Sequence, residues 1–123
     1  MKIGMIGLGK MGANMARRLM RDGHAVVGFD LDDDAVHDLE ADGAAGATDL
    51  DALVGQLDPP RVCWMMVPAG DAVDATIDEV LPHLNAGDVL VDGGNSNYKD
   101  TLRRADRTAE TGVHYVDVGT SGG

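Results

Sequence analysis

Cysteine is nearly absent from this chain of 123 residues. The one cysteine, Cys63, lies in an apolar run over residues 62–67. A single cysteine cannot form an intramolecular disulfide, and the four histidines are scattered without the spacing of metal ligands. We therefore expect a buried structural thiol in a cytoplasmic protein, with neither a disulfide framework nor a metal site.

Long apolar runs are also lacking. No stretch approaches the roughly 20 apolar residues that a transmembrane helix needs. The first residues enter a predicted strand directly, which leaves no room for a secretory signal. We expect no membrane association.

Positive charge is scarce, with 10 Lys and Arg against 21 Asp and Glu and a net charge of −11. This balance argues against nucleic acid or an anionic membrane as a partner. Most of the acids are Asp, and several fall at positions predicted to be exposed: Asp32, Asp33, Asp34, Asp38, Asp42, Asp49 and Asp51. Dense short carboxylates are typical of a halophilic surface, whose repulsion is screened by salt. A merely acidic soluble protein is the alternative.

Apolar runs alternate with helical patterns along the whole chain, which indicates an α/β fold with a doubly wound parallel sheet, in one domain over residues 1–123. Several runs are continuously apolar, as in strands covered on both faces. The predicted strands are residues 2–6, 25–30, 44–46, 61–67, 88–91 and 114–118.

The helices have recognisable faces and ends. Met11, Met15 and Leu19 predict the core-facing side of a first helix. Four glycines stand before strands in C-cap positions: Gly23, Gly43, Gly87 and Gly112. Further helices are predicted over residues 49–56, 71–84 and 98–111.

Three side-chain patterns refine these helices. Thr48 with Asp51 predicts a capping box for the helix over residues 49–56. Pro82 should bend the next helix, because it lacks an N–H for the ladder. The last helix should carry its arginines on its polar side: Arg103, Arg104 and Arg107.

A glycine pattern follows the first predicted strand, and Asp30 closes the second. Gly7 permits the tight turn out of the strand, Gly9 lets the backbone approach a pyrophosphate, and Gly12 lets the helix lie close to the sheet. The N–H groups and positive dipole end of that helix attract phosphates. Asp30 lies where a carboxylate can accept hydrogen bonds from both ribose hydroxyls. The sequence therefore predicts a dinucleotide site, whereas a glycine-rich turn that binds nothing leaves Asp30 unexplained.

Asp30 also indicates which dinucleotide is bound. A 2′-phosphate would face this carboxylate with like charge, and neither Arg nor Lys occurs in the following Leu31-Asp32-Asp33-Asp34. NAD is therefore favoured over NADP.

Two further glycine-rich segments, residues 92–96 and 117–123, follow later strands. In open parallel sheets, ligands bind outside the carboxyl ends of the strands. Asn95 and Ser121 offer hydrogen bonds to a carboxylate or to hydroxyls. Each segment alone is equally well explained as a turn, but together with the first motif they indicate a substrate site.

At these residues the chain resembles the 6-phosphogluconate dehydrogenase family, the decarboxylating enzymes of the pentose phosphate pathway. The resemblance covers the whole chain. It rests on Gly7-Leu8-Gly9-Lys10-Met11-Gly12-Ala13-Asn14, on Asp92-Gly93-Gly94-Asn95-Ser96 with Tyr98, Asp100, Thr101, Arg103 and Arg104, and on Gly119-Thr120-Ser121-Gly122-Gly123. The first stretch is shared with the wider β-hydroxyacid dehydrogenase superfamily, and the second is the specific part.

The resemblance implies roles for individual residues. Implied cofactor contacts are Gly7, Leu8, Gly9, Lys10, Met11, Gly12, Asp30, Val67, Pro68, Ala69 and Asn95. Implied contacts with 6-phosphogluconate are Asn95, Ser121, Gly122 and Gly123.

The chain departs from the NADP-using members at two places. They resemble one another in an Asn-Arg-Thr turn where this chain has Asp30-Leu31-Asp32, and many have Val-Lys-Ala-Gly where it has Val67-Pro68-Ala69-Gly70. Both departures resemble the shorter, NAD-using type.

The resemblance also implies a reaction, in which NAD oxidises C3 of 6-phosphogluconate and loss of CO2 gives ribulose 5-phosphate. Family members continue into a helical domain that supplies a lysine base, a glutamate acid, phosphate-binding arginines and the dimer interface. None of these maps onto the chain, and neither Lys10 nor Lys99 is a substitute. We therefore expect a nucleotide-binding part truncated before that domain, without catalytic residues, from a protein that is a homo-oligomer at full length.

Two alternatives stay open. One is another β-hydroxyacid dehydrogenase of the 3-hydroxyisobutyrate type, although that type resembles Asp-x-Ser-Thr where this chain has Asp92-Gly93-Gly94-Asn95-Ser96. The other is a non-catalytic nucleotide-binding module.

Overall fold

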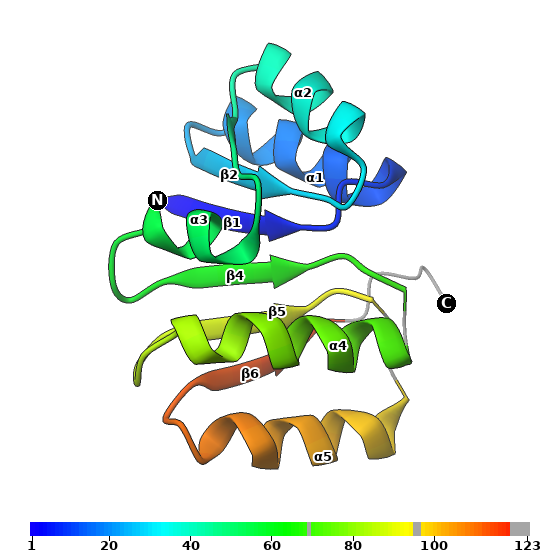
Figure 1. The fold of residues 1–123 in the computed structure, drawn as a ribbon, viewed down its shortest axis with the longest axis vertical. Helices are drawn as coiled ribbons and strands as arrows, with labels where there is room; N and C mark the ends of the chain where they lie inside the picture. The colour runs from blue at the N-terminus through cyan, green and yellow to red at the C-terminus, as the bar shows by residue number, and fades with distance from the viewer. Residues whose placement is uncertain (69, 95–96, 119–123) are drawn as a thin grey trace.

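The sheet confirms the predicted fold class. The structure is a computed structural model that describes residues 1–68, 70–94 and 97–118. Its parallel strands are β1 (Lys2–Ile6), β2 (Ala25–Phe29), β3 (Ala45–Gly46), β4 (Val62–Met65), β5 (Val89–Asp92) and β6 (His114–Asp117). They lie in the order β3-β2-β1-β4-β5-β6 (Figure 1), which is the order of a Rossmann fold.

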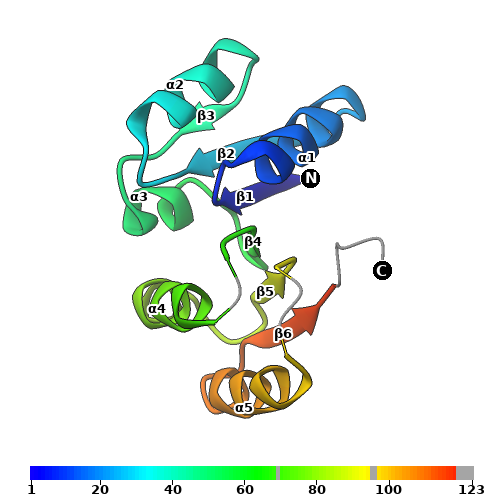
Figure 2. The same cartoon turned by 90° about the vertical axis from the view of Figure 1, so that its right-hand side faces the viewer.

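Helices cover both faces of this sheet. On one face lie α1 (Lys10–Arg21) and α2 (Asp33–Ala41). Of α2, only the glycine after its end, Gly43, was predicted. On the other face lie α3 (Leu50–Gly55), α4 (Asp71–Val80) and the short 3-10 helix η1 (Leu81–His83). Figure 2 shows α1 and α4 on opposite sides of the strands, with α5 (Tyr98–Ala109) beside α4 along β6.

The two-sided cover explains why the strands are continuously apolar. In β1, Met5 packs under α1 and α2, while its neighbour Ile6 packs under α3 and α4. Cys63 in β4 is fully buried, and burial raises the pKa of its thiol to about 12. The predicted role of Cys63 as a buried structural thiol is confirmed.

Three of the four predicted C-cap glycines end helices. Gly23, Gly43 and Gly112 have positive φ angles two or three residues after the ends of α1, α2 and α5. Gly87 also has a positive φ, but it lies in the turn between η1 and β5, where the N–H of Asp88 donates to Asn85.

Three local predictions were wrong. Asp49, not Thr48, caps α3, because its carboxylate accepts from the N–H of Ala52 at 2.7 Å and so occupies the capping position. The helix expected to reach residue 84 ends at Val80 and continues as η1, which has Pro82 in its first turn. Met15 and Leu19 pack on the core as predicted, whereas Met11 is 54% exposed because it sits at the open start of α1.

Candidate functional site

Residues 7–12, which we call the glycine turn, follow β1. They lie at the point where the strand order changes direction, between the carboxyl ends of β1 and β4. Gly7 has a φ of 97°, a conformation that strongly favours glycine. A Cβ on Gly7 would lie 2.6 Å from the carbonyl oxygen of Met66, at the end of β4. The N–H of Gly7 donates to Phe29 at the end of β2. The turn is therefore packed against both neighbouring strands.

Gly9 and Gly12 differ in what surrounds them. A Cβ on Gly12 would collide with the carbonyl oxygen of Gly7, so this glycine allows α1 to approach the turn. Gly9 has open space around the same position, with nothing within 4 Å. The crowding at Gly12 fits helix–sheet packing, and the open face at Gly9 fits the approach of a ligand.

The N-terminus of α1 is left without a side-chain cap. Asp32, Asp49 and Asn97 cap α2, α3 and α5 through their side chains, but Gly9 gives α1 no such bond. The first turn of α1 also holds no acidic residue. Its N–H groups and positive dipole end are thus available to an anion such as a pyrophosphate.

Asp30 follows β2 directly and faces the glycine turn. One carboxylate oxygen accepts from the N–H of Leu8 at 2.6 Å, and the other accepts from the N–H of Asp32 at 2.8 Å. The side chain of Leu8 is buried in the core under α1. Asp30 therefore lies beside the turn with a fixed orientation, where the acid of a ribose site is needed.

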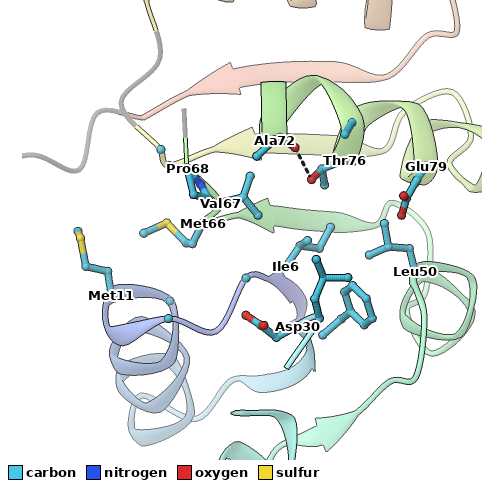
Figure 3. A pocket seen from close by; sticks show the side chains of 18 of the residues that line it. Ile6, Met11, Asp30, Leu50, Met66, Val67, Pro68, Ala72, Thr76 and Glu79 are labelled. Atoms are coloured by element: carbon cyan, nitrogen blue, oxygen red, sulfur yellow. Dashed lines mark hydrogen bonds between the residues drawn. The ribbon is translucent and has the colours of Figure 1, made fainter. Parts of the chain in front are cut away.

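These elements surround one cleft of about 750 Å³ (Figure 3). Eight of the predicted cofactor-binding residues line it: Gly7, Gly9, Lys10, Met11, Gly12, Asp30, Val67 and Pro68. Leu8 reaches the site only through its backbone. Ala69 and Asn95 lie outside the described residues, as do Ser121, Gly122 and Gly123. A cleft of this size, with a glycine turn, an uncapped helix and a carboxylate in line, fits a dinucleotide.

The sequence did not predict the wall that α3 and α4 contribute. Leu50 begins α3, and one face of α4 lines the cleft through Ala72, Ala75, Thr76 and Glu79. These α4 positions follow the i, i+3, i+4, i+7 spacing of one helix face, which adjoins the stripe of buried Val73, Ile77 and Val80. Three of the four side chains are small, and this run of small residues beside an apolar stripe is the only sign of the wall that the sequence carries. Thr76 also donates to the carbonyl of Ala72 at 2.7 Å (Figure 3).

At the end of β5, Gly93 and Gly94 line the cleft while Asp92 is fully buried. One oxygen of Asp92 accepts from the N–H of Gly94 at 2.9 Å, and the other accepts from the hydroxyl of Tyr115 at 2.7 Å. Burial, with the bond to Asp92, raises the pKa of Tyr115 well above its usual range, so it stays a neutral donor.

Arg104 lies beside these groups and is fully buried, so its predicted place on the polar side of α5 was wrong. Its Nε and one terminal nitrogen donate to the two oxygens of Asp74 on α4, at 3.0 and 3.2 Å. These bonds, with those from Arg103, hold the pKa of Asp74 far below its usual range. The facing carboxylate from a neighbouring helix explains how a guanidinium can be buried here.

Two absences concern the described residues. In residues 1–68, 70–94 and 97–118, no three His, Cys, Asp or Glu side chains gather as a metal site would require. No helix in that part of the chain has both the length and the apolarity to cross a bilayer.

The two lysines considered as a possible base lie apart. Lys10 lines the cleft at the start of α1, and Lys99 is exposed on α5.

Comparison with known proteins connects this geometry to a family. The family profile described as the NAD binding domain of 6-phosphogluconate dehydrogenase matches residues 2–123. The NAD(+)-dependent, decarboxylating 6-phosphogluconate dehydrogenase of Haloferax volcanii is 47% identical over all of this chain, which spans 40% of that relative's length.

Solved structures agree on the fold. The 6-phosphogluconate dehydrogenase of Plasmodium falciparum, solved in apo form and with NADP+ or 6-phosphogluconate, is 29% identical, with a TM-score of 0.88 over 100% of this chain and 28% of its own. The 3-hydroxyisobutyrate dehydrogenase of Mycobacterium tuberculosis is also 29% identical, with a TM-score of 0.89 over 99% of this chain and 41% of its own. With the profile match over residues 2–123, this chain belongs to the family of the NAD binding domain of 6-phosphogluconate dehydrogenase, an oxidoreductase domain with a Rossmann fold.

Proposed function

We propose that this chain is the NAD-binding part of an enzyme that oxidatively decarboxylates 6-phosphogluconate to ribulose 5-phosphate, CO2 and NADH. The observation that carries the proposal is the meeting of three features in one cleft. These are the Gly7 turn, the Asp30 carboxylate beside it, and the Gly93-Gly94 segment at the end of β5. The first two serve a dinucleotide, and the third leads into the segment that distinguishes this family from other hydroxyacid dehydrogenases.

The proposed arrangement of the cofactor follows the strand order. The adenosine ribose would bind at Asp30, and the pyrophosphate would bind at the uncapped start of α1. The nicotinamide would then lie across the sheet, toward Val67, Pro68 and Gly94 at the ends of β4 and β5. When bound, NAD accepts a hydride from the carbon that is oxidised.

The substrate would occupy the same end of the sheet. We propose that Asn95 contacts both cofactor and substrate, and that Ser121, Gly122 and Gly123 hold the sugar acid near its carboxylate. Among the described residues, the ionisable side chains that line the cleft are Lys10, Asp30 and Glu79. The proposed arrangement assigns Lys10 to the pyrophosphate and Asp30 to the ribose, and Glu79 lies near Leu50, away from Pro68 (Figure 3). The general base that this oxidation needs would therefore come from outside this chain, in a full-length, cytoplasmic homo-oligomer.

A second candidate is a 3-hydroxyisobutyrate-type dehydrogenase, which the structural likeness at a TM-score of 0.89 brings forward. The two classes share the cofactor half of the fold, so that half does not separate them. The sequence Asp92-Gly93-Gly94-Asn95-Ser96 favours 6-phosphogluconate. A non-catalytic nucleotide-binding module is the third candidate.

A substrate comparison on the full-length protein tests the proposal. With NAD present, we expect NADH and CO2 to form in equal amounts from 6-phosphogluconate, and little NADH to form from 3-hydroxyisobutyrate. The reverse preference would assign the second candidate. NAD binding without turnover of either acid would leave the non-catalytic module.

A further inference from the structure

Arg104, which we did not assign to the cofactor cleft, connects two of the loops that line it. We define the Arg104 network as Asp74 on α4, Arg104 on α5, Asp92 at the end of β5 and Tyr115 on β6. Arg104 and Asp92 are each fully buried, and Asp74 and Tyr115 are partly buried.

One side of the network holds the loop between β4 and α4. A terminal nitrogen of Arg104 donates to the carbonyl of Gly70 at 3.1 Å while also donating to Asp74, four residues further along. Gly70 has a φ of 98° and is the N-cap of α4 without a side-chain cap. Arg104 therefore fixes the point at which this loop turns into the helix, two residues after the cleft-lining Pro68.

The other side holds the loop between β5 and α5. One carboxylate oxygen of Asp92 accepts from the N–H of Gly94, which lines the cleft. The second oxygen lies 3.9 Å from a terminal nitrogen of Arg104. The hydroxyl of Tyr115 binds the second oxygen of Asp92. The carboxylate is thus oriented by β6 and α5 while it holds the backbone of the cleft wall.

The two loops also touch one another. A Cβ on Gly94 would lie 2.7 Å from the carbonyl oxygen of Val67, so the two backbones pack without a side chain between them. A shift of either loop therefore changes the position of both. Their cleft-lining parts, Val67 with Pro68 and Gly93 with Gly94, form the wall opposite the Asp30 side.

We infer that Arg104 and Asp92, with Tyr115, are positioning residues for the nicotinamide half of the NAD site. They act through Gly70 and Gly94 and touch neither the adenosine ribose site at Asp30 nor the glycine turn. This inference rests on the proposed cofactor site. It predicts that disturbing the network weakens binding of the nicotinamide part of NAD selectively, because the adenosine half is held by β1, α1 and β2.

The test compares NAD with ADP-ribose, which carries the adenosine and pyrophosphate but no nicotinamide, by titration calorimetry on the full-length protein. In Arg104→Gln we expect affinity for NAD to fall about tenfold or more, and affinity for ADP-ribose to change less than about twofold. Tyr115→Phe removes one hydroxyl and keeps the ring, so it tests the network with the smaller change to the buried packing. Its NAD affinity should fall about threefold to fivefold.

Arg103→Gln is the matched control. Arg103 is exposed, and in the part of the chain that the structure describes it bonds the same Asp74 and Asp100 rather than Gly70 or Asp92. The ratio of NAD affinity to ADP-ribose affinity should therefore stay unchanged in this variant. A parallel loss of NAD and ADP-ribose binding in the network variants, or an unchanged ratio in folded Tyr115→Phe, overturns the inference. Equal affinity of the wild type for both ligands also overturns it, because the wall would then contribute nothing. Failure of the wild type to bind NAD would instead remove the proposed function.

Discussion

The carboxylate of Asp30 accepts a 2.6 Å hydrogen bond from the backbone N–H of Leu8, inside the glycine turn. The residue placed to recognise a ribose is thus also bonded to the turn that is placed to bind the pyrophosphate. Substitution of Asp30 should therefore act on the choice of cofactor and on the turn together.

We predict that the full-length protein prefers NAD and that Asp30→Asn narrows the preference. The aspartate repels a 2′-phosphate, and like charges in contact cost on the order of a few kcal/mol. The asparagine oxygen can still accept from one of the two N–H groups, of Leu8 and Asp32, that the carboxylate binds, so the turn should be weakened but kept. Steady-state kinetics with both cofactors provide the measurement. The ratio of kcat/KM with NAD to kcat/KM with NADP should fall by about tenfold or more in the variant. Equal or better kcat/KM with NADP in the wild type would contradict the assignment.

Gly9→Ala and Gly12→Ala form a matched pair that separates binding from folding. Gly12→Ala should lower the free energy of unfolding by roughly 1–3 kcal/mol, because the new methyl collides with Gly7. Gly9→Ala should change it by less than about 0.5 kcal/mol, because its surroundings are open and its φ of −65° suits alanine. Gly9→Ala should nevertheless lose NAD affinity. Chemical denaturation and calorimetry measure the two effects, and undiminished NAD binding by Gly9→Ala would place the pyrophosphate elsewhere.

Acid should destabilise the fold through Asp74. Its folded-state pKa is depressed by Arg104 and then Arg103, so its stabilisation is complete above the unfolded pKa of about 3.9 and is lost as the pH falls below that value. Asp74→Asn should cost about 3 kcal/mol at pH 7, because the buried Arg104 loses the carboxylate to which its Nε and a terminal nitrogen donate. In denaturation experiments, the difference in the free energy of unfolding between wild type and Asp74→Asn should narrow from pH 4 to pH 2.

Asp78→Asn is the control on the same helix. Asp78 pairs with Arg107 at the surface, where an ion pair contributes at most about 1 kcal/mol. Stability curves of wild type and Asp74→Asn that run parallel through the acid range would refute the role given to Asp74.

Salt should stabilise the protein. The seven aspartates predicted to be exposed around α2 and α3 are all exposed, and the net charge is −11. Their repulsion acts over about 10 Å at 0.1 M ionic strength and over about 3 Å at 1 M. Thermal melts should therefore show Tm rising from dilute buffer to molar KCl, and equally in NaCl if screening is the cause. A flat or falling Tm would leave an acidic surface without salt adaptation.

Residues 1–123 alone should bind NAD weakly and turn over nothing. The glycine turn and Asp30 are complete, so affinity for the adenosine half should survive. Without a general base and a closed site, several orders of magnitude in rate should be missing. Calorimetry with NAD and a sensitive NADH assay with 6-phosphogluconate measure both points, and clear turnover would show that the catalytic residues were misplaced.

The cofactor side of the cleft could be predicted because its requirements are local in the chain. Gly7, Gly9 and Gly12 lie within six residues, and each answers to a backbone constraint that few other residues meet. Asp30 is further away, but the end of a strand next to β1 fixes its place. The wall formed by Ala72, Ala75 and Thr76 escaped prediction, because small side chains on one face of α4 do not show what faces them.

The sequence by itself determined the alternation of strands and helices, the glycine turn and the ribose acid. All of these follow from short-range periodicity and backbone conformation. Only the tertiary structure decided that Arg104 is buried. The sequence predicts Arg104 as one of three arginines on a polar helix face. Burying a guanidinium costs free energy unless a carboxylate pairs with it. That carboxylate is Asp74, 30 residues earlier on another helix, and only the packing of α4 against α5 brings the two together.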